Sequence, residues 1–198
     1  MSDIYKTIST PTEGIYKEKG SKFLSFAIPV SNSDEVREII KEYRKRFFDA
    51  RHICYAYMFG AERTDFRAND DGEPSSTAGR PILGQINSLE LTNVLVIVVR
   101  YFGGILLGTG GLVTAYKEAA YDALNQAEII EKTVNETISI NFDYIQMNDV
   151  MRVIKDTNPQ ILSHTFDNQC NMKLSIRKQD AEFLIEKLEK ISSISIEN

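Results

Sequence analysis

Five glycines fall within residues 103–111, in the stretch RYFGGILLGTGG that runs from Arg100 to Gly111. Glycine adopts positive φ and lets a second backbone or a ligand approach closely. A helix that begins near Thr109, with Thr109 as its cap, would offer free N–H groups and a positive dipole end to an anion. The candidates for this phosphate cradle are Gly103, Gly104, Gly108, Thr109, Gly110 and Gly111. Their spacing matches neither GxxxxGK[ST] nor GxGxxG, and tight strand-to-helix packing explains the glycines equally well.

A second polar group lies in DDGEPSSTAGR, from Asp70 to Arg80. Its carboxylates are ligands that magnesium prefers, and its hydroxyls could donate to an oxyanion or act as nucleophiles. Asp and Gly also make ordinary solvated turns, and this turn interpretation is favoured over a metal site. We therefore expect no metal, no cofactor and no catalytic residue, but a candidate functional loop made of Asp70, Asp71, Glu73, Ser75 and Thr77.

The remaining candidates are basic. His52 follows Arg51 at the start of a strand-like run, and its imidazole could act as a general base or a phosphate ligand. A lone histidine more often caps or packs, so we assign it no catalytic role. Arg51, Arg80 and Arg100 would supply charge for phosphate contacts. A basic stripe of Arg37, Lys41, Arg44 and Lys45 shares one exposed helix side, which is usually only a solvated face.

Hydrophobic periodicity predicts the elements that hold these residues. The stretch GIYKEKGSKFLSFAIPV predicts two strands that turn at Gly20 and Ser21, and a helix capped by Ser33 follows. HICYAYMFG alternates as a strand, residues 61–79 read as one long loop, and a short helix has Pro81 in its first turn. TNVLVIVVRYF predicts a central strand that is apolar on both faces. After the glycines, one side of a long helix carries Leu112, Tyr116, Ala119, Ala120, Ala123 and Ala127.

The tail alternates strands and helices in the order βαββαβ, which is the order of a ferredoxin-like domain. We predict an α+β fold with two domains, residues 1–135 and 136–198.

Composition narrows the function. The chain has 198 residues, a net charge of −5 and two cysteines. It has no run of about 18 apolar residues and no apolar signal core at its start, so we expect no membrane span and a reducing, cytoplasmic location. Neither half is basic, which argues against strong sequence-blind nucleic-acid binding, and we expect no DNA sequence readout.

Taken together, ARHICYAY, DDGEPSSTAGRPIL, LTNVLVIVVRYFGGILLGTGGLVTAY and the βαββαβ tail resemble the YigZ/IMPACT family in its bacterial two-domain form. The resemblance implies an N-terminal domain with a left-handed βαβ crossover, similar to domain IV of elongation factor G. It implies that the tail is similar to domain V of that factor. Eukaryotic relatives regulate translation by binding the activator of an initiation-factor kinase, largely through an extra domain.

The residues of this chain that match the family pattern include His52, Asp70, Asp71, Glu73, Thr77, Arg100 and the five glycines. Ile53 and Ser76 depart from it, and Leu106 and Thr114 stand where relatives commonly carry lysine and arginine. The last two departures remove positive charge near the proposed cradle.

The first functional hypothesis is a non-enzymatic, translation-linked regulatory or binding protein. It would contact RNA, the ribosome or a translation-factor partner through its N-terminal domain. The alternative is a magnesium-dependent enzyme for a phosphorylated small molecule or nucleotide, with Asp71 and Glu73 holding the metal. A pure protein-binding module is the third.

Overall fold

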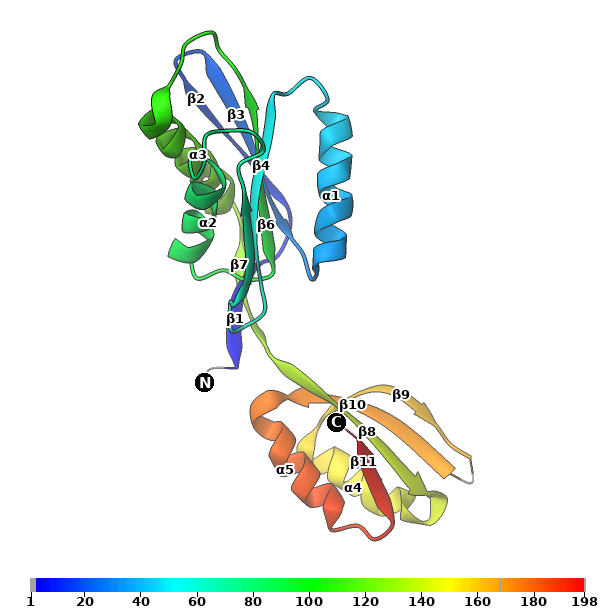
Figure 1. Ribbon diagram of the computed structural model, residues 1–198. Coiled ribbons are helices and arrows are strands. Elements are labelled where there is room, and N and C mark those ends of the chain that lie inside the picture. Colours follow the sequence, from blue (N-terminus) through cyan, green and yellow to red (C-terminus); the bar gives the residue numbers. More distant parts are fainter. Residues whose placement is uncertain (1–2, 168, 198) are drawn as a thin grey trace. The chain divides into compact units, whose positions relative to one another are not determined.

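A computed structural model of the protein describes residues 3–167 and 169–197 (Figure 1). Contacts between Cα atoms group the chain into two units. The N-terminal unit contains residues 5–132. The C-terminal unit contains Asp3, Ile4 and the described residues from Thr133 onward.

The first part of the chain alternates short strands with three helices. Its elements are β1 (Ile4–Ile8), β2 (Thr12–Glu18), β3 (Ser21–Pro29), α1 (Ser33–Arg46), β4 (His52–Phe59), β5 (Asp65–Asn69), α2 (Gly79–Ser88), β6 (Val94–Tyr101), α3 (Gly108–Asn125) and β7 (Ile129–Thr133).

Five of these strands form one antiparallel sheet in the order β2-β3-β6-β4-β5, and β1 pairs with β7 in a separate two-stranded sheet. Helix α1 covers one face of the large sheet, while α2 and α3 cover the other (Figure 1). Strands β3 and β4 both run antiparallel to β6, which lies between them, so α1 connects two strands that run the same way. The left-handed sense of this crossover and its likeness to domain IV of elongation factor G stay predictions.

Strand β6 is the centre of this sheet, as its sequence predicts. Residues Val94 to Val99 are all fully buried. Their side chains alternate between the faces, so Val94, Val96 and Val98 pack under α2 and α3, while Leu95, Ile97 and Val99 pack under α1. This alternation directs the next residue in the first series, Arg100, to the α3 face. That placement decides the chemistry of the site.

Two local predictions were wrong, and one small sheet was not predicted. Residues 61–79 are not one loop, because they contain the edge strand β5. Its residues are exposed or half-buried, and its alternation of Phe66 and Ala68 with polar residues extends over only five positions. The cap of α1 is Asn32 rather than Ser33, and its side chain accepts the backbone N–H groups of Asp34 and Glu35. The small sheet of β1 and β7 had no predicted counterpart.

The C-terminal unit has the predicted βαββαβ order, so the α+β class is confirmed. It contains β8 (Asn135–Asp143), a short 3-10 turn η1 (Tyr144–Gln146), α4 (Met147–Thr157), β9 (Gln160–Thr165), β10 (Gln169–Arg177), α5 (Lys178–Glu189) and β11 (Ile194–Glu197). Its sheet is antiparallel in the order β11-β8-β10-β9. Alternate residues of β8 and β10 pack with α4 and α5 in a separate core.

An ion pair joins the start of the chain to this unit. Arg177 donates from Nε to Oδ2 of Asp3 at 2.6 Å and from a second nitrogen to Oδ1 at 2.8 Å. The hydrogen bond and the positive charge lower the pKa of the Asp3 carboxyl, and the pair raises the pKa of Arg177. Asp3 therefore lies next to residues about 174 positions away in sequence.

Candidate functional site

Glu73 is the hub of a buried polar network in the N-terminal unit. Its side chain is only 3% exposed. Oε1 accepts a hydrogen bond from Arg100 at 2.6 Å and another from the Tyr116 hydroxyl at 2.7 Å. A buried carboxylate needs such partners, because an unpaired charge in this environment costs several kcal/mol. The loop, β6 and α3 each contribute one of these three residues.

Strand register explains why His52 joins this network. His52 is the cross-strand neighbour of Arg100, so both side chains lie on the same face of the sheet. Nδ1 of His52 lies 2.8 Å from the carbonyl oxygen of Asp71. A carbonyl only accepts, so Nδ1 carries the hydrogen. Nε2 then faces Glu73 at 3.9 Å.

Asp71 extends the hydrogen-bonding of strand β4 past the end of β5. The β5 pairing runs from Phe59 to Tyr55, and beyond it Oδ2 of Asp71 accepts the backbone N–H of Ile53 at 2.7 Å. Oδ1 accepts a hydrogen bond from Arg44 of α1 at 2.6 Å. Asp71 itself has a positive φ of 43°. Its carboxylate therefore connects the loop to both β4 and α1.

Asp70 caps helix α2 from a distance. One carboxylate oxygen accepts the backbone N–H groups of Ala78 and Gly79 at 3.0 and 2.8 Å, and the other accepts that of Ser76 at 2.8 Å. The residue at the cap position, Ala78, has no side chain that could do this. A carboxylate at a helix N-terminus satisfies free donors and faces the positive end of the dipole. The role of Asp70 is therefore to hold the loop on α2.

Cys54 and Tyr116 are the fully buried members of the network. The Cys54 thiol donates to the carbonyl oxygen of Asp70 at 3.0 Å and lies 3.4 Å from the Tyr116 oxygen. Burial raises the pKa of both groups far above their ordinary values. Both stay protonated at neutral pH, so Tyr116 acts as a neutral donor to Glu73 and Cys54 is not a thiolate nucleophile.

The backbone needs glycine at two positions of the run, Gly103 and Gly108. A Cβ atom on Gly103 would lie 1.8 Å from the backbone carbon of Gly20, so the loop after β6 can pack on the β2–β3 turn only without a side chain there. Gly108 has a φ of +69° where α3 begins. The predicted Thr109 cap is wrong, because the helix starts at Gly108 and Leu107 holds the cap position without a side-chain hydrogen bond.

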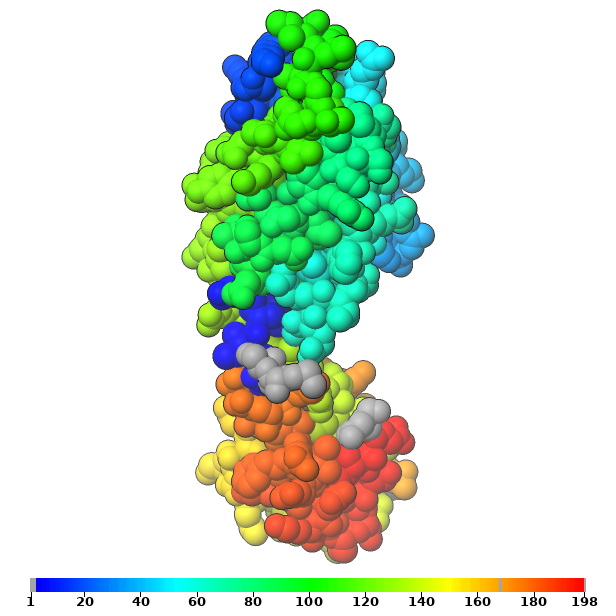
Figure 2. Space-filling view, turned by 60° about the vertical axis from the view of Figure 1, so that its left-hand side comes forward, coloured from blue at the N-terminus to red at the C-terminus, as the bar shows by residue number. Residues whose placement is uncertain are grey.

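The other glycines of the predicted cradle lie around this helix start. Gly104 has a φ of +88°, Gly110 has open space around it, and Gly111 lies against Leu107. Gly108, Thr109 and Gly110 are exposed. Figure 2 shows the loop 102–107, in bright green, at the surface at the top of the view. The helix start is therefore accessible, as an anion would need.

The structure thus brings His52, Asp71, Glu73 and Arg100 together and leaves the other candidates apart. Thr77 is buried and donates to the carbonyl oxygen of Pro74 at 2.6 Å. Ser75, Arg51 and Arg80 are exposed, and within residues 3–167 and 169–197 the side chains of both arginines make no ion pair. A phosphate could reach Arg100 only by displacing Glu73, although the Nε atom of Arg100 has no partner among the described residues.

Sequence reasoning missed three members of the network. Tyr116 lies on the apolar side of α3 and was interpreted as core packing, and Arg44 was part of the exposed stripe. Cys54 was considered as one of two cysteines. The only signal for Tyr116 was the hydroxyl group of an aromatic residue on a buried helix face, which needs a partner.

No group of three or more metal-ligating side chains occurs among the described residues. The two carboxylates of the magnesium hypothesis already have arginine partners, Asp71 with Arg44 and Glu73 with Arg100. None of the described helices combines the length and apolar character that a membrane crossing requires.

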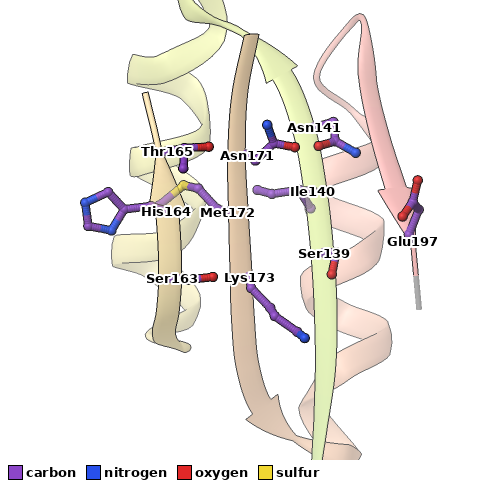
Figure 3. A pocket seen from close by; sticks show the side chains of 10 residues that line it. All are labelled: Ser139, Ile140, Asn141, Ser163, His164, Thr165, Asn171, Met172, Lys173 and Glu197. Atoms are coloured by element: carbon purple, nitrogen blue, oxygen red, sulfur yellow. The ribbon is translucent and has the colours of Figure 1, made fainter. Parts of the chain in front are cut away.

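The C-terminal unit has a hollow of its own, about 230 Å³, on the face of its sheet away from the helices (Figure 3). The surrounding side chains are mostly short hydroxyls and amides, such as Ser139, Asn141 and Asn171, with Lys173 and Glu197. The ring of His164 points away from them (Figure 3) and stacks on Phe166 at 4.6 Å. Among the described residues, no phenylalanine or tyrosine lines this hollow.

Comparison with known proteins gives a family match within the N-terminal unit and relatives that cover most of the chain. Residues 19–124 match the family model called Impact N-terminal domain. IMPACT family member YvyE of Bacillus subtilis is 33% identical over 79% of this chain and 72% of its own length. IMPACT family member YigZ of Escherichia coli is 31% identical over 80% and 78%. A crystal structure described as that of a hypothetical protein has 26% identity and a TM-score of 0.77, and the match covers 99% of this chain and 97% of that one.

Proposed function

The chain belongs to the IMPACT family, and from this premise we propose that it is a non-enzymatic, cytoplasmic regulatory protein linked to translation. It acts by binding RNA, the ribosome or a translation factor through its N-terminal unit. The resemblance to eukaryotic relatives that regulate translation supports the link to translation. The geometry of the loop 70–80 supports binding rather than catalysis.

One observation supports the non-enzymatic part: the three carboxylates of the loop 70–80 all have hydrogen-bond partners within the protein. Asp70 caps α2, Asp71 holds β4 and α1, and Glu73 is buried with Arg100 and Tyr116. A general acid or base must be within hydrogen-bond reach of the proton that it transfers, and a metal needs open ligands. These groups instead hold together a rigid scaffold under the exposed surface.

The exposed groups support an anionic partner. Arg51 and Arg80 are exposed, and the helix start at Gly108 and Gly110 is open. These features lie in the same unit. The phosphate groups of RNA match them, because arginine and helix N-termini both bind phosphate.

The test is binding of short single-stranded RNAs and of ribosomal subunits between about 50 and 200 mM salt, the range in which phosphate-driven affinity falls steeply. Binding that weakens with salt, and weakens further in the variant Arg51→Gln/Arg80→Gln, is the expected result. The variant Arg152→Gln, which changes an exposed arginine of α4, is the control. Absence of binding to RNA and to subunits at 50 mM salt would exclude both contacts.

A specific observation also favours a protein partner. The loop after β6 exposes three large apolar side chains, Phe102, Ile105 and Leu106, the last of them 83% exposed. Exposed apolar groups of this size often mark protein contacts. A translation factor that binds this loop would stay bound after ribonuclease treatment, and Leu106→Ser would weaken it. Loss of the partner on ribonuclease treatment would contradict this second candidate.

A further inference from the structure

A groove lies on the α1 face of the large sheet, opposite the buried network. Helix α1 does not cover the whole of this face, and a space of about 410 Å³ remains between the helix and strands β4 and β5. Tyr55 and Tyr57 of β4 form its floor, and both are half-buried. This volume falls in the range of about 300–1,000 Å³ that is usual for ligand sites.

The strand pattern places these groups together. Tyr55 and Tyr57 alternate with Cys54 and Ala56, which point to the other face. Arg67 of β5 is the cross-strand partner of Tyr57, so its side chain lies on the groove face beside that ring. Arg37 borders the groove from α1.

A neighbouring ring on the same strand supports Tyr57. The ring of Tyr57 contacts that of Phe59 with 4.7 Å between centroids, and Phe59 is buried in the core under α1. Val36 and Ile40 of α1 form the apolar wall. The floor is therefore made of two half-buried rings, of which that of Tyr57 packs on a core residue.

The charge of the groove is opposite to that of the protein. The chain has a net charge of −5, yet the lining contains two arginines and no acidic residue. Arg37 is paired with Asp34 on the outer surface of α1. Arg67 is exposed and makes no ion pair among the described residues, so its charge is available to a ligand.

We propose that this groove binds single-stranded RNA, with bases stacked on Tyr55 and Tyr57 and the backbone phosphates held by Arg67. Single-strand sites combine aromatic platforms with basic groups that follow the backbone. The groove has both, whereas the one described ring beside the hollow of the C-terminal unit, that of His164, points away from it. The inference rests on the proposed function, which makes RNA the partner. It adds a site with aromatic rings for the bases, on other elements than the glycine run and Arg80.

The test measures the affinity of the full chain for a fluorescent single-stranded oligonucleotide across salt concentrations. Tyr57→Leu is expected to weaken binding about tenfold without changing the salt slope, because it removes stacking and no phosphate contact. Arg67→Gln is expected to lower the slope of log K against log salt by about 0.7. Tyr57→Phe keeps the ring and should bind nearly as the natural chain does, and Arg152→Gln is the charge-matched control.

Thermal unfolding of each variant checks that it is folded. Photo-crosslinking of an oligonucleotide that contains 4-thiouridine gives a second readout, and the modified peptide should contain Tyr55 and Tyr57. Salt-dependent RNA binding with all groove variants unchanged would overturn the groove and leave the proposed function standing. Failure of the natural chain to bind any RNA would overturn the groove together with the RNA part of the proposed function. Retained binding by Tyr57→Leu with crosslinks elsewhere would assign the contact to another surface.

Discussion

Glu73 and Arg100 form a buried ion pair, with 2.6 Å between Oε1 and the guanidinium nitrogen, across a separation of 27 residues. The side chain of Arg100 is 8% exposed. The arginine is also within 5.7 Å of the ring centroids of Phe23 and Phe102, so it is enclosed by aromatic groups. This pair links the loop 70–80 to the central strand.

Removing one partner of this pair should be costly. Arg100→Met leaves the Glu73 carboxylate buried with the Tyr116 hydroxyl and with His52 Nε2 at 3.9 Å, but without its arginine partner. We expect a loss of about 3–5 kcal/mol in the free energy of unfolding. Urea denaturation would measure it. The double variant Glu73→Gln/Arg100→Met removes both charges and should lose less than Arg100→Met alone. Arg51→Met is the exposed control, and a loss below about 1 kcal/mol for Arg100→Met would contradict the role of the pair.

Asp70 should behave as a helix cap. Asp70→Ala removes the acceptor for three backbone N–H groups at the start of α2, so we expect a loss of about 0.5–2 kcal/mol in unfolding free energy. Asp65→Ala changes an exposed aspartate of β5 and should stay within about 0.5 kcal/mol of the natural chain. Equal effects of the two substitutions, measured by denaturation, would show that the capping bonds do not contribute.

Two glycines of the run should respond in opposite ways. Gly103→Ala would push a methyl group into the backbone of Gly20 and should destabilise the protein, whereas Gly110→Ala meets open space in the first turn of α3. The second change should be neutral or stabilise by up to about 0.5–1 kcal/mol, because alanine loses less entropy in a helix. Melting temperatures of the two variants test this. A lower melting temperature for Gly110→Ala than for Gly103→Ala would refute the packing explanation.

The Asp3–Arg177 pair predicts a dependence on pH in the acid range. The folded pKa of Asp3 lies below its ordinary value near 4, with the Arg177 hydrogen bond as the main cause. A lowered carboxyl pKa stabilises the folded state above the unfolded value, and this stabilisation is lost as the pH falls through the folded value. Arg177→Gln should therefore lower the melting temperature at pH 7, and this effect should shrink as the pH falls through the folded pKa of Asp3.

NMR titration of the Asp3 carboxyl gives the direct measurement. Its pKa should rise toward the ordinary value in Arg177→Gln and stay low in the control Arg152→Gln. An unchanged pKa in Arg177→Gln would show that the pair does not set the titration.

Elements with a strong apolar pattern were predicted well. The central strand β6 and the helices α1 and α3 carry runs or stripes whose spacing depends only on local geometry. Strand β5 was missed because its alternation of apolar and polar residues is only five residues long, within a stretch rich in turn-forming residues. Its pairing with β4 is decided by the sheet rather than by its own residues.

The site was predicted in part, because the sequence shows which residue types are present but not which residues pair with one another. His52, Asp71, Glu73 and Arg100 were all candidates, but the sequence assigned Glu73 to a solvated loop and Arg100 to phosphate. Only the alternation of β6 and the fold of the loop reveal that each is the other's partner. Arg44, in the first helix, could be connected with Asp71 only in three dimensions.

The link between Asp3 and Arg177 has a consequence for synthesis and dissection of the chain. During translation Asp3 is synthesised long before Arg177. The ion pair of the C-terminal unit can therefore form only after Arg177 has been added to the chain. A fragment that starts at residue 133 would lack that carboxylate and would leave a guanidinium without its counterion. Peptides from the extreme N-terminus, added back in trans, would be the natural complement to such a fragment.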